Sequence, residues 1–221
     1  MENSTFELIT KESEYKFTED WFSRHKILWE KLLDKLQPKK ILEIGAFEGR
    51  ATTFMIEQCG KRNPLEIYCV DTWQGGVLSN LIHQDFVEVQ KRFDKNTKFA
   101  IDNVPNEVKL HKIVATSLVG LGQLAAEGHH DFDLVYVDGS HIACDVFFDA
   151  AMAFQLCRNG GIIIFDDYRE DSREPYIYPK IAIDAFVAAH ADKIQHLRFS
   201  NEEREIPMDQ LYQRYYWKMV R

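Results

Sequence analysis

Short apolar runs alternate with helical patterns along most of this chain, and this alternation limits the fold more than any other feature. Apolar runs predict strands at 41–44, 65–70, 108–114, 132–137 and 162–165, with helical periodicity between them. Such strands lie parallel in one sheet with helices on both faces. Two last strands, at about 195–200 and 215–220, lack a helical crossover, so we expect an antiparallel hairpin there. The sequence therefore predicts a Rossmann-like, doubly wound α/β fold with a mostly parallel, seven-stranded sheet and a C-terminal antiparallel strand.

The N-terminal part carries its own helical pattern. Apolar residues at helical spacing predict a helix over 18–36, with Thr18 as its cap and Trp21 and Trp29 as core anchors. Pro38 ends this helix, so we divide the chain into an N-terminal extension at 1–37 and a catalytic domain at 38–221. The helix either covers the mouth of a site or packs against a second subunit, as in a homodimer.

The remaining helices are predicted with less regular boundaries. We expect helices ending at about Gln58, over 118–127 and over 179–190, and one that carries Cys157 on its buried face and stops at Asn159-Gly160-Gly161. In the stretch 72–108, one helix face is formed by Ile82, Phe86, Val89 and Phe93, and loop is indicated by Asn96, Asp102, Asn103, Pro105 and Asn106.

Charge and composition exclude several classes of function. The 221 residues suit one domain, and 35 acidic against 27 basic residues give a formal net charge of −8. No basic run is dense enough to follow a nucleic-acid backbone. The first residues do not resemble a secretory signal, no apolar run approaches the length of a membrane span, and the four cysteines lack metal-site spacing. We expect a cytoplasmic protein that binds neither nucleic acid nor membrane.

A glycine turn follows the first strand and opens a helix. Gly45 and Gly49 leave room for a ligand to approach the backbone, and the helix start offers free N–H groups. The third glycine of a dinucleotide-binding turn is absent, and Glu48 would repel a pyrophosphate. Glu43, two residues before the turn, suits a cationic ligand group. The turn therefore favours a ligand other than a dinucleotide.

Polar residues end four of the predicted strands, all at the same edge of the sheet. They are Asp71, Thr116 with Ser117, Asp138 with His141, and Asp166 with Asp167. Asp71 stands where a carboxylate accepts hydrogen bonds from a ribose, although it could instead cap a helix. The pair His129-His130 beside Asp131 resembles a metal site, but it lies at the entry to a strand, the opposite edge from α/β chemistry. Together the strand ends predict a nucleoside-binding cleft.

These residues resemble the class I S-adenosylmethionine (SAM)-dependent methyltransferases. The resemblance covers about residues 38–168 and is carried by Leu42-Glu43-Ile44-Gly45, Gly49, Asp71 and Asp138. It implies that Gly45 and Gly49 line the methionine part of SAM, Glu43 supports its ammonium group, Asp71 holds the ribose, Thr116 and Ser117 lie near adenine, and Thr52 and Thr53 meet the carboxylate. The complete set of cofactor-binding residues that it implies is Glu43, Gly45, Ala46, Gly49, Thr52, Thr53, Asp71, Thr72, Trp73, Thr116, Ser117 and Asp138.

The second half is similar to the metal-dependent O-methyltransferases of natural-product sugars and, more loosely, to catechol-type enzymes. The similarity lies in Val137-Asp138-Gly139-Ser140-His141 and in Asp166-Asp167, where catechol-type enzymes usually have Asp-Asn. It implies a divalent cation held by Asp138, Asp166 and Asp167; oxygen ligands favour Mg²⁺ or Ca²⁺ over Zn²⁺, and of these we expect Mg²⁺. Asp138 and His141 are the candidate catalytic residues, His141 as general base or else as a helix cap.

The sequence thus predicts a SAM-dependent, metal-assisted O-methyltransferase that acts on a hydroxyl of a small, sugar-like or polyhydroxylated acceptor. Tyr168, Tyr176 and Tyr178, in the loop after the fifth strand, are candidates for a lid over that acceptor. Two alternatives stay open. One is a nucleotide-dependent oxidoreductase, and the other is a methyltransferase fold that binds the cofactor without catalysis.

Overall fold

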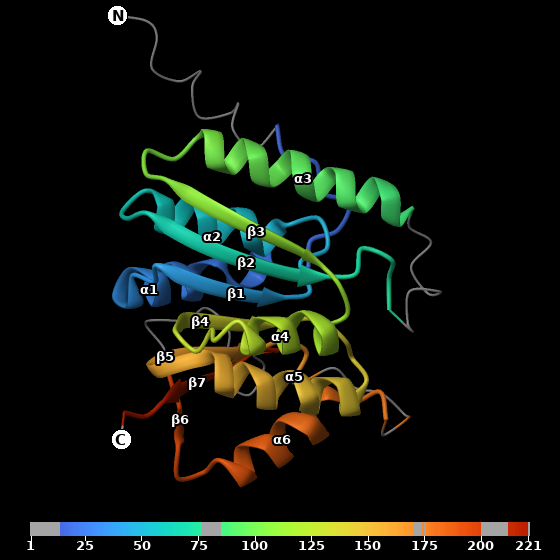
Figure 1. Ribbon diagram of the computed structural model, residues 1–221, viewed down its shortest axis with the longest axis vertical. Coiled ribbons are helices and arrows are strands. Elements are labelled where there is room, and N and C mark those ends of the chain that lie inside the picture. Colours follow the sequence, from blue (N-terminus) through green and yellow to red (C-terminus); the bar gives the residue numbers. More distant parts are fainter. Residues whose placement is uncertain (1–13, 77–84, 170–173, 175, 200–211, 221) are drawn as a thin grey trace, which may run out of the picture.

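The structure of the protein is a computed structural model (Figure 1), and it describes residues 14–76, 85–169, 174, 176–199 and 212–220. The predicted helix residue Ile82, part of the loop at 169–178 and the end of the strand at 195–200 lie outside these residues. Within the described residues, no helix combines the length and the hydropathy that crossing a membrane requires.

Seven strands within the described residues form one sheet in the order β3-β2-β1-β4-β5-β7-β6. They are β1 Lys40–Ile44, β2 Leu65–Asp71, β3 Val108–Val114, β4 Phe132–Val137, β5 Cys157–Phe165, β6 Ile194–His196 and β7 Arg214–Lys218. The pairs among β1 to β5 are parallel, and β7 runs antiparallel to both β5 and β6. The predicted parallel sheet and the C-terminal antiparallel strand are confirmed.

Helices cover both faces of this sheet, as Figure 1 shows. On one face the core joins the sheet to α1 (Lys26–Leu36), α2 (Arg50–Gly60) and α3 (Phe86–Asp102), and a short 3-10 helix, η1 (Ser23–His25), precedes α1. On the other face the core joins the sheet to α4 (Ser117–Ala126), α5 (Ala143–Leu156) and α6 (Pro179–Ala189). The prediction of a doubly wound fold is therefore confirmed.

The strand order changes direction beside β1, and this position determines where a ligand can bind. β2 and β3 lie on one side of β1, while β4 and β5 lie on the other. The helices after β1 and β4 pack on opposite faces, so the loops that lead to them separate at the carboxyl ends of the strands. Ligands of open α/β sheets bind in the crevice that such a separation leaves. The candidate site therefore lies at this carboxyl edge.

The N-terminal segment differs from its prediction. The helix begins at η1 rather than at Thr18, whose N–H and hydroxyl donate instead to the carboxylate of Glu48, at 2.6 and 2.8 Å. Trp21 is 49% exposed and not a core anchor, whereas Trp29 is fully buried as predicted. Because the buried Glu48 carboxylate requires hydrogen-bond donors, the segment before η1 lies against the glycine turn instead of forming a helix. The division at residue 37 stays a prediction, although α1 packs into the same core as α2.

Two predicted boundaries were wrong for local reasons. Asn96 and Asp102 lie inside α3, because the Asn96 side chain is buried and bonds the backbone of Lys16 and Glu48. The helix expected to contain Cys157 ends at Leu156, and Cys157 already belongs to β5. The Asn159-Gly160-Gly161 run therefore lies within a strand, near a shift in register against β4.

Candidate functional site

The glycine turn fits its place only with glycine at position 45. Gly45 has a φ of +83°, and a Cβ there would lie 2.0 Å from the carbonyl oxygen of Asp138. The loops after β1 and β4 therefore touch through backbone at this point. Gly49, with a φ of +80°, is the N-cap residue of α2. The structure thus brings the predicted cofactor turn and the predicted catalytic Asp138 into direct contact.

Asp71, at the end of β2, holds this turn in place. One carboxylate oxygen accepts from the N–H groups of Ala46 and Phe47, at 2.8 and 2.9 Å, and the other accepts from Trp73 N–H at 2.7 Å. The indole of Trp73 donates to the Phe47 carbonyl at 2.8 Å. Phe47 and Trp73 both have positive φ values, +49° and +46°, and such strain concentrates at functional sites.

The predicted ribose contact of Asp71 stays a prediction, with room left for it. A carboxylate offers about four lone-pair positions, and three backbone N–H groups occupy three of them. The alternative of a helix cap does not describe this contact, because the next helix, α3, is capped by Asp85. Thr72 is half-buried and accepts from Gln74 N–H at 3.2 Å, so its hydroxyl serves the turn after Asp71.

The other predicted residues near the methionine end point into the protein. Glu43 is 1% exposed, accepts from the Thr52 hydroxyl at 2.5 Å and contacts Cys69 Sγ at 3.4 Å. Burial raises the pKa of the Glu43 carboxyl to about 7, against the lowering effect of the Thr52 hydroxyl. Thr53 donates to the carbonyl of Arg50 within α2. Glu43, Thr52 and Thr53 are all buried, and their predicted contacts with SAM stay predictions.

The residues predicted near adenine begin α4. Thr116 is its exposed N-cap residue and Ser117 its first residue. The N–H of Ala115 donates to the Asp71 carbonyl oxygen at 3.0 Å, which brings this loop beside the ribose candidate. Thr116, Ser117 and Asp71 therefore share one end of the crevice.

A buried network joins two of the predicted catalytic and metal-binding carboxylates. The Tyr136 hydroxyl lies 2.9 Å from Asp138 Oδ2 and also contacts Asp166 Oδ2, which accepts from Gln213 Nε2 at 2.8 Å. Burial, and then the charges of Asp166 and Asp167, raise the pKa of Asp138 well above its usual range. Since Tyr136 has one hydroxyl proton for two carboxyl groups, the second contact requires a proton on a carboxyl.

His141 and Asp167 form a pair of their own at this edge. His141 Nε2 lies 3.3 Å from Asp167 Oδ2, and both side chains are partly exposed. Asp167 has a φ of +53°, and its N–H donates to Asp166 Oδ1 at 2.8 Å. The predicted base thus faces a predicted metal ligand rather than Asp138. As a base it has an acidic partner that orients the ring.

The three carboxylates predicted to hold magnesium do not form one ligand group in the structure. The Tyr136 hydroxyl contacts both Asp138 and Asp166, while Asp167 faces His141. Across the part of the chain that the structure describes, no three His, Cys, Asp or Glu side chains could together hold a metal ion. The donor chemistry, oxygen only and rich in negative charge, still suits Mg²⁺. The magnesium site therefore stays a prediction.

Tyr136, Gln213 and the N-terminal segment are parts of the site that the sequence analysis missed. The indole N–H of Trp29, in α1, donates to Gln213 Oε1 at 2.8 Å and so reaches the carboxylates through Gln213. His25, in η1, is buried, and burial lowers its pKa against the raising effect of Asp166. Tyr136 had one available signal, since it lies in β4 two residues before Asp138, which directly follows the strand. No local pattern indicates Gln213, which lies 47 positions from Asp166.

The tyrosines proposed as a lid have separate environments. Tyr168 donates to Asp184 at 2.9 Å, and its ring lies under the guanidinium of Arg214 at 3.9 Å. Tyr176 is 60% exposed, and Tyr178 is the N-cap residue of α6. Residues 170–173 and 175 lie outside the described residues, so the lid stays a prediction.

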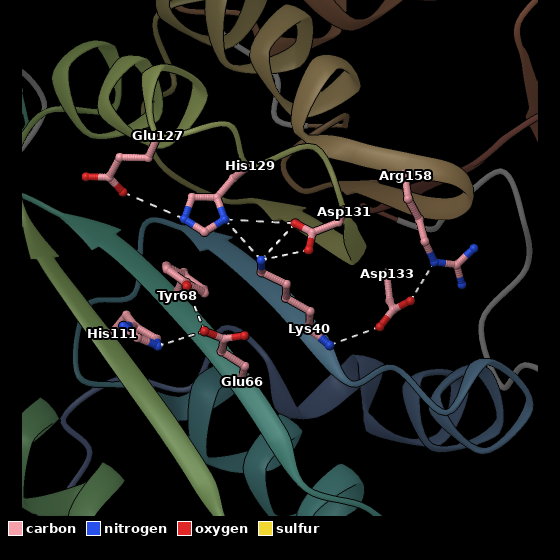
Figure 2. Close-up of polar contacts among 9 residues, drawn as sticks. All are labelled: Lys40, Glu66, Tyr68, His111, Glu127, His129, Asp131, Asp133 and Arg158. Carbon is pink, nitrogen blue, oxygen red and sulfur yellow. Dashed lines mark hydrogen bonds and ion pairs between the residues drawn. The ribbon is translucent and has the colours of Figure 1, made fainter.

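The histidine pair after α4 lies at the opposite, amino edge of the sheet (Figure 2). There Lys40 Nζ lies 2.7 Å from Asp131 and 3.0 Å from His129 Nδ1, and Figure 2 shows Lys40 pointing between the two side chains. This arrangement agrees with the expectation that the pair does not form the α/β active site. Its lysine and acids instead tie the loop before β4 to β1.

The comparisons with known proteins agree with this location. The model of a protein family described as a methyltransferase domain matches residues 42–168, which include the end of β1, all of β2 to β5 and all predicted cofactor-binding and metal-binding residues. An uncharacterized protein, R132 of Acanthamoeba polyphaga mimivirus, is 23% identical over 148 residues. The match covers 63% of this chain but only 56% of the length of that relative.

Solved structures share the fold. An O-methyltransferase from Bacillus cereus, in complex with S-adenosylhomocysteine (SAH), matches at 16% identity with a TM-score of 0.60 over 93% of this chain and 84% of that one. TomG, an O-methyltransferase from Streptomyces achromogenes in complex with SAM, matches at 17% identity with a TM-score of 0.60 over 89% of this chain and 80% of that one. A putative O-methyltransferase from Klebsiella pneumoniae matches at 16% identity with a TM-score of 0.63 over 92% of this chain and 84% of that one. Since the family model spans more than half of the sequence, the chain belongs to this methyltransferase-domain family.

Proposed function

We propose that the protein transfers the methyl group of SAM to a hydroxyl oxygen of a small, sugar-like or polyhydroxylated acceptor. The observation that carries the proposal is the backbone contact at Gly45, which places a strained cofactor turn directly against Asp138. Donor-binding and acceptor-binding groups are thereby held side by side. Family membership supports methyl transfer, and proteins of similar fold bind SAH and SAM.

The cofactor half of the site is built to hold a nucleoside with a charged amino-acid tail. Asp71 retains acceptor capacity for a ribose hydroxyl. The N-terminus of α2, after Gly49, favours a carboxylate, since its first N–H groups lack partners within the helix. When bound, SAM supplies a sulfonium methyl group that an acceptor oxygen can displace. Positioning of this kind contributes about 7 to 11 kcal/mol to lowering a barrier.

The acceptor half has to remove a proton from a hydroxyl. The His141 ring, oriented by Asp167, is the group placed to accept that proton. The backbone of Asp138 touches the glycine turn, its carboxylate accepts from Tyr136, and we assign this carboxylate the hydrogen bond that orients the acceptor. Tyr136 and Gln213 hold the neighbouring Asp166 and keep this side of the crevice rigid.

Magnesium assistance is the second part of the proposal. Asp138, Asp166 and Asp167 would hold the cation, which when bound lowers the pKa of the acceptor hydroxyl. The support is that burial, and after it the negative charges of Asp166 and Asp167, raise the pKa of Asp138, and a cation would neutralise those charges. Protein treated with a chelator should turn over at least about tenfold more slowly than protein with Mg²⁺ restored, because the cation supplies several kcal/mol of charge stabilisation. Equal rates would contradict this part alone.

Calorimetry with SAH tests the cofactor assignment. We expect wild-type protein to bind SAH, and Gly45→Ala to bind it at least about 100-fold more weakly, because the added Cβ forces the two loops apart. Gly122→Ala is the matched control, since no atom lies within 4 Å of its added Cβ in α4. Its SAH affinity should be unchanged and its free energy of unfolding raised by about 0.5 to 1 kcal/mol. Circular dichroism checks that Gly45→Ala is folded.

The same measurements separate the two alternatives. Binding of NAD with no binding of SAH would establish an oxidoreductase in place of a methyltransferase. Binding of SAH without methylation of any compound in a panel of sugars, catechols and other polyols would indicate a binding module. Methylation of an acceptor hydroxyl, detected by mass spectrometry, is the result that the proposal requires.

A further inference from the structure

The buried amide of Gln213, the residue before β7, has different partners at its two ends. Its oxygen Oε1 accepts from the indole N–H of Trp29 at 2.8 Å and from the hydroxyl of Tyr215 at 2.5 Å. Because an indole N–H can only donate, the amide oxygen must lie at this end and the amide nitrogen at the other. All three side chains have 0% exposure, so the bonds form away from water. The direction of the amide is therefore fixed by the core.

The amide nitrogen of Gln213 donates to the acid network at the carboxyl edge. Its N–H groups reach Asp166 Oδ2 at 2.8 Å and the Tyr136 hydroxyl oxygen at 3.2 Å. Asp166 thus receives a hydrogen bond from a donor that side chains of α1 and β7 hold in place. The position of this carboxylate depends, through Gln213, on parts of the chain far from it in sequence.

The other oxygen of Asp166 passes this position on to the next residue. Asp166 Oδ1 accepts from the backbone N–H of Asp167 at 2.8 Å. Asp167 has a φ of +53°, which a residue with a side chain rarely adopts unless its surroundings hold it. Its carboxylate oxygen Oδ2 lies 3.3 Å from His141 Nε2. A continuous series of polar contacts therefore runs from Gln213 through both aspartates to the candidate base.

We propose that Gln213 is a positioning residue that aims the Asp167 carboxylate at the His141 ring. Trp29 anchors Gln213 for this role. The inference rests on the proposed function, in which His141 takes the proton of the acceptor hydroxyl. It goes beyond that function because Trp29 and Gln213 both lie outside residues 42–168, the part of the chain that the family model matches. The N-terminal helix α1 and the residue before β7 thus complete the site of this chain.

Gln213→Glu tests the proposal, because it keeps an oxygen for Trp29 and Tyr215 but replaces the N–H groups with a second oxygen. Turnover is measured with the polyol or catechol that wild-type protein methylates. We expect it to fall by about tenfold or more, the effect of losing one hydrogen bond to a carboxylate. The dissociation constant of SAH should change by less than about twofold, since the glycine turn keeps its own bonds to Asp71. A merely structural role would lower stability and leave turnover per folded molecule unchanged.

A second readout needs neither cofactor nor acceptor. Nitrogen NMR of the histidine rings reports the surroundings of His141, whose signal is identified by its loss in His141→Gln. In Gln213→Glu this signal should shift, because the Asp167 carboxylate moves relative to the ring. Trp29→Phe adds no charge and removes only the indole donor. It should shift the signal less, since Tyr215 still donates to Gln213.

Two matched controls make the same kinds of change elsewhere. The Gln123 amide donates to Glu127 at 2.9 Å, so Gln123→Glu also places an oxygen beside a carboxylate. Tyr15→Phe removes a hydroxyl that donates to Glu57 at 2.6 Å, and so removes one hydrogen bond of the N-terminal segment away from the acid network. Both controls should keep wild-type turnover and an unchanged His141 signal.

Different results would overturn the inference and the proposed function. Folded Gln213→Glu with wild-type turnover, or with an unmoved His141 signal, contradicts the inference while leaving methyl transfer intact. If Gln213→Glu does not fold, Trp29→Phe decides by the shift of the same signal. If wild-type protein methylates no compound of the acceptor panel, the proposed function fails instead, and the His141 signal in Gln213→Glu still decides whether Gln213 positions the ring.

Discussion

Both edges of the sheet carry acidic side chains, but these side chains have opposite kinds of partner at the two edges. At the amino edge the acids have cationic partners, as Figure 2 shows: Asp131 contacts Lys40 at 2.7 Å, and Asp133 contacts Arg158 at 2.6 Å. Against the raising effect of burial, the hydrogen bond and charge of Lys40 hold the pKa of Asp131 below its usual value. Charge is balanced at this edge, and its acids stabilise the fold.

At the carboxyl edge Glu43, Asp138 and Asp166 contact hydroxyl, thiol and amide groups, while the partly exposed Asp167 faces His141. Glu43 contacts Thr52 and Cys69, and burial raises its pKa to about 7. Asp138 shares the Tyr136 hydroxyl with Asp166, and burial followed by neighbouring charge raises its pKa as well. Acids in such surroundings reduce stability unless a ligand or cation compensates them. The contrast indicates that the carboxyl edge is arranged for binding and catalysis.

The largest effect should come from Asp138→Asn. We expect turnover to fall by about 10²-fold, because the variant removes the carboxylate that we assign to orienting the acceptor. SAH affinity should change less than threefold, since the backbone of residue 138, which touches Gly45, is kept. The free energy of unfolding should stay equal or rise, because a buried charge is lost. Single-turnover kinetics and calorimetry measure these quantities.

A different outcome would make the two edges alike. If Asp138→Asn unfolds readily and retains turnover per folded molecule, then Asp138 is a structural acid like those of the amino edge. Tyr136→Phe offers an independent check, since it removes the shared hydroxyl without removing either carboxylate.

The contrast between the edges also explains what the sequence could predict. Strands β3 and β4 were predicted to the residue, because apolar runs bounded by polar residues are a local signal. The strand ends with Asp71, Asp138 and Asp166 follow from the same signal, since parallel strands bring their carboxyl ends to one edge. Local patterns therefore located the site and the acids in it.

The partners of these acids could not be predicted, because they come from distant parts of the chain. Gln213, the residue before β7, donates to Asp166, and Trp29 donates to Gln213 from 184 positions away in the sequence. The same holds for the segment of the exposed Trp21, where Thr18 contacts Glu48, 30 positions away, and does not cap a helix.

The second-largest effect concerns how the free energy of unfolding changes with pH, which follows from the raised pKa of Glu43. Glu43 keeps its proton in the folded protein up to about pH 7, whereas in the unfolded chain it ionises near its ordinary value of 4.5. The folded state therefore binds more protons between these values, and stability falls as the pH rises through them. We expect Glu43→Gln to remove on the order of 2 to 3 kcal/mol of this loss between pH 5 and 7.

Urea unfolding at pH 5, 6 and 7 measures this difference. The control is Glu66→Gln at the amino edge, where hydrogen bonding from Tyr68 and the charge of Lys40 outweigh burial and lower the pKa of Glu66. Glu66 is ionised in both states above pH 5, so Glu66→Gln should leave the slope of stability against pH unchanged. Equal slopes for Glu43→Gln and wild type would contradict the raised pKa.

The third effect, on stability alone, is expected from Asp133→Asn. Asp133 accepts from the N–H groups of Lys39 and Lys40, at 2.7 and 2.9 Å, and pairs with Arg158. Loss of its charge should lower the free energy of unfolding by about 1 to 2 kcal/mol, since the bonds it accepts are charge-assisted. Turnover per folded molecule should not change. A tenfold loss of turnover at full stability would mean that the amino edge takes part in function.

The smallest effect should come from Asp131→Asn at the same edge. The Asp131 side chain is 59% exposed, so its ion pair with Lys40 is screened by water and should contribute at most about 1 kcal/mol. The cost should shrink further in 0.5 M salt, because salt screens exposed charges. Urea unfolding at two salt concentrations tests both statements. A larger, salt-independent cost would show that Asp131 acts through the His129 and Lys40 packing on the sheet, so that the amino edge would depend on geometry more than on charge balance.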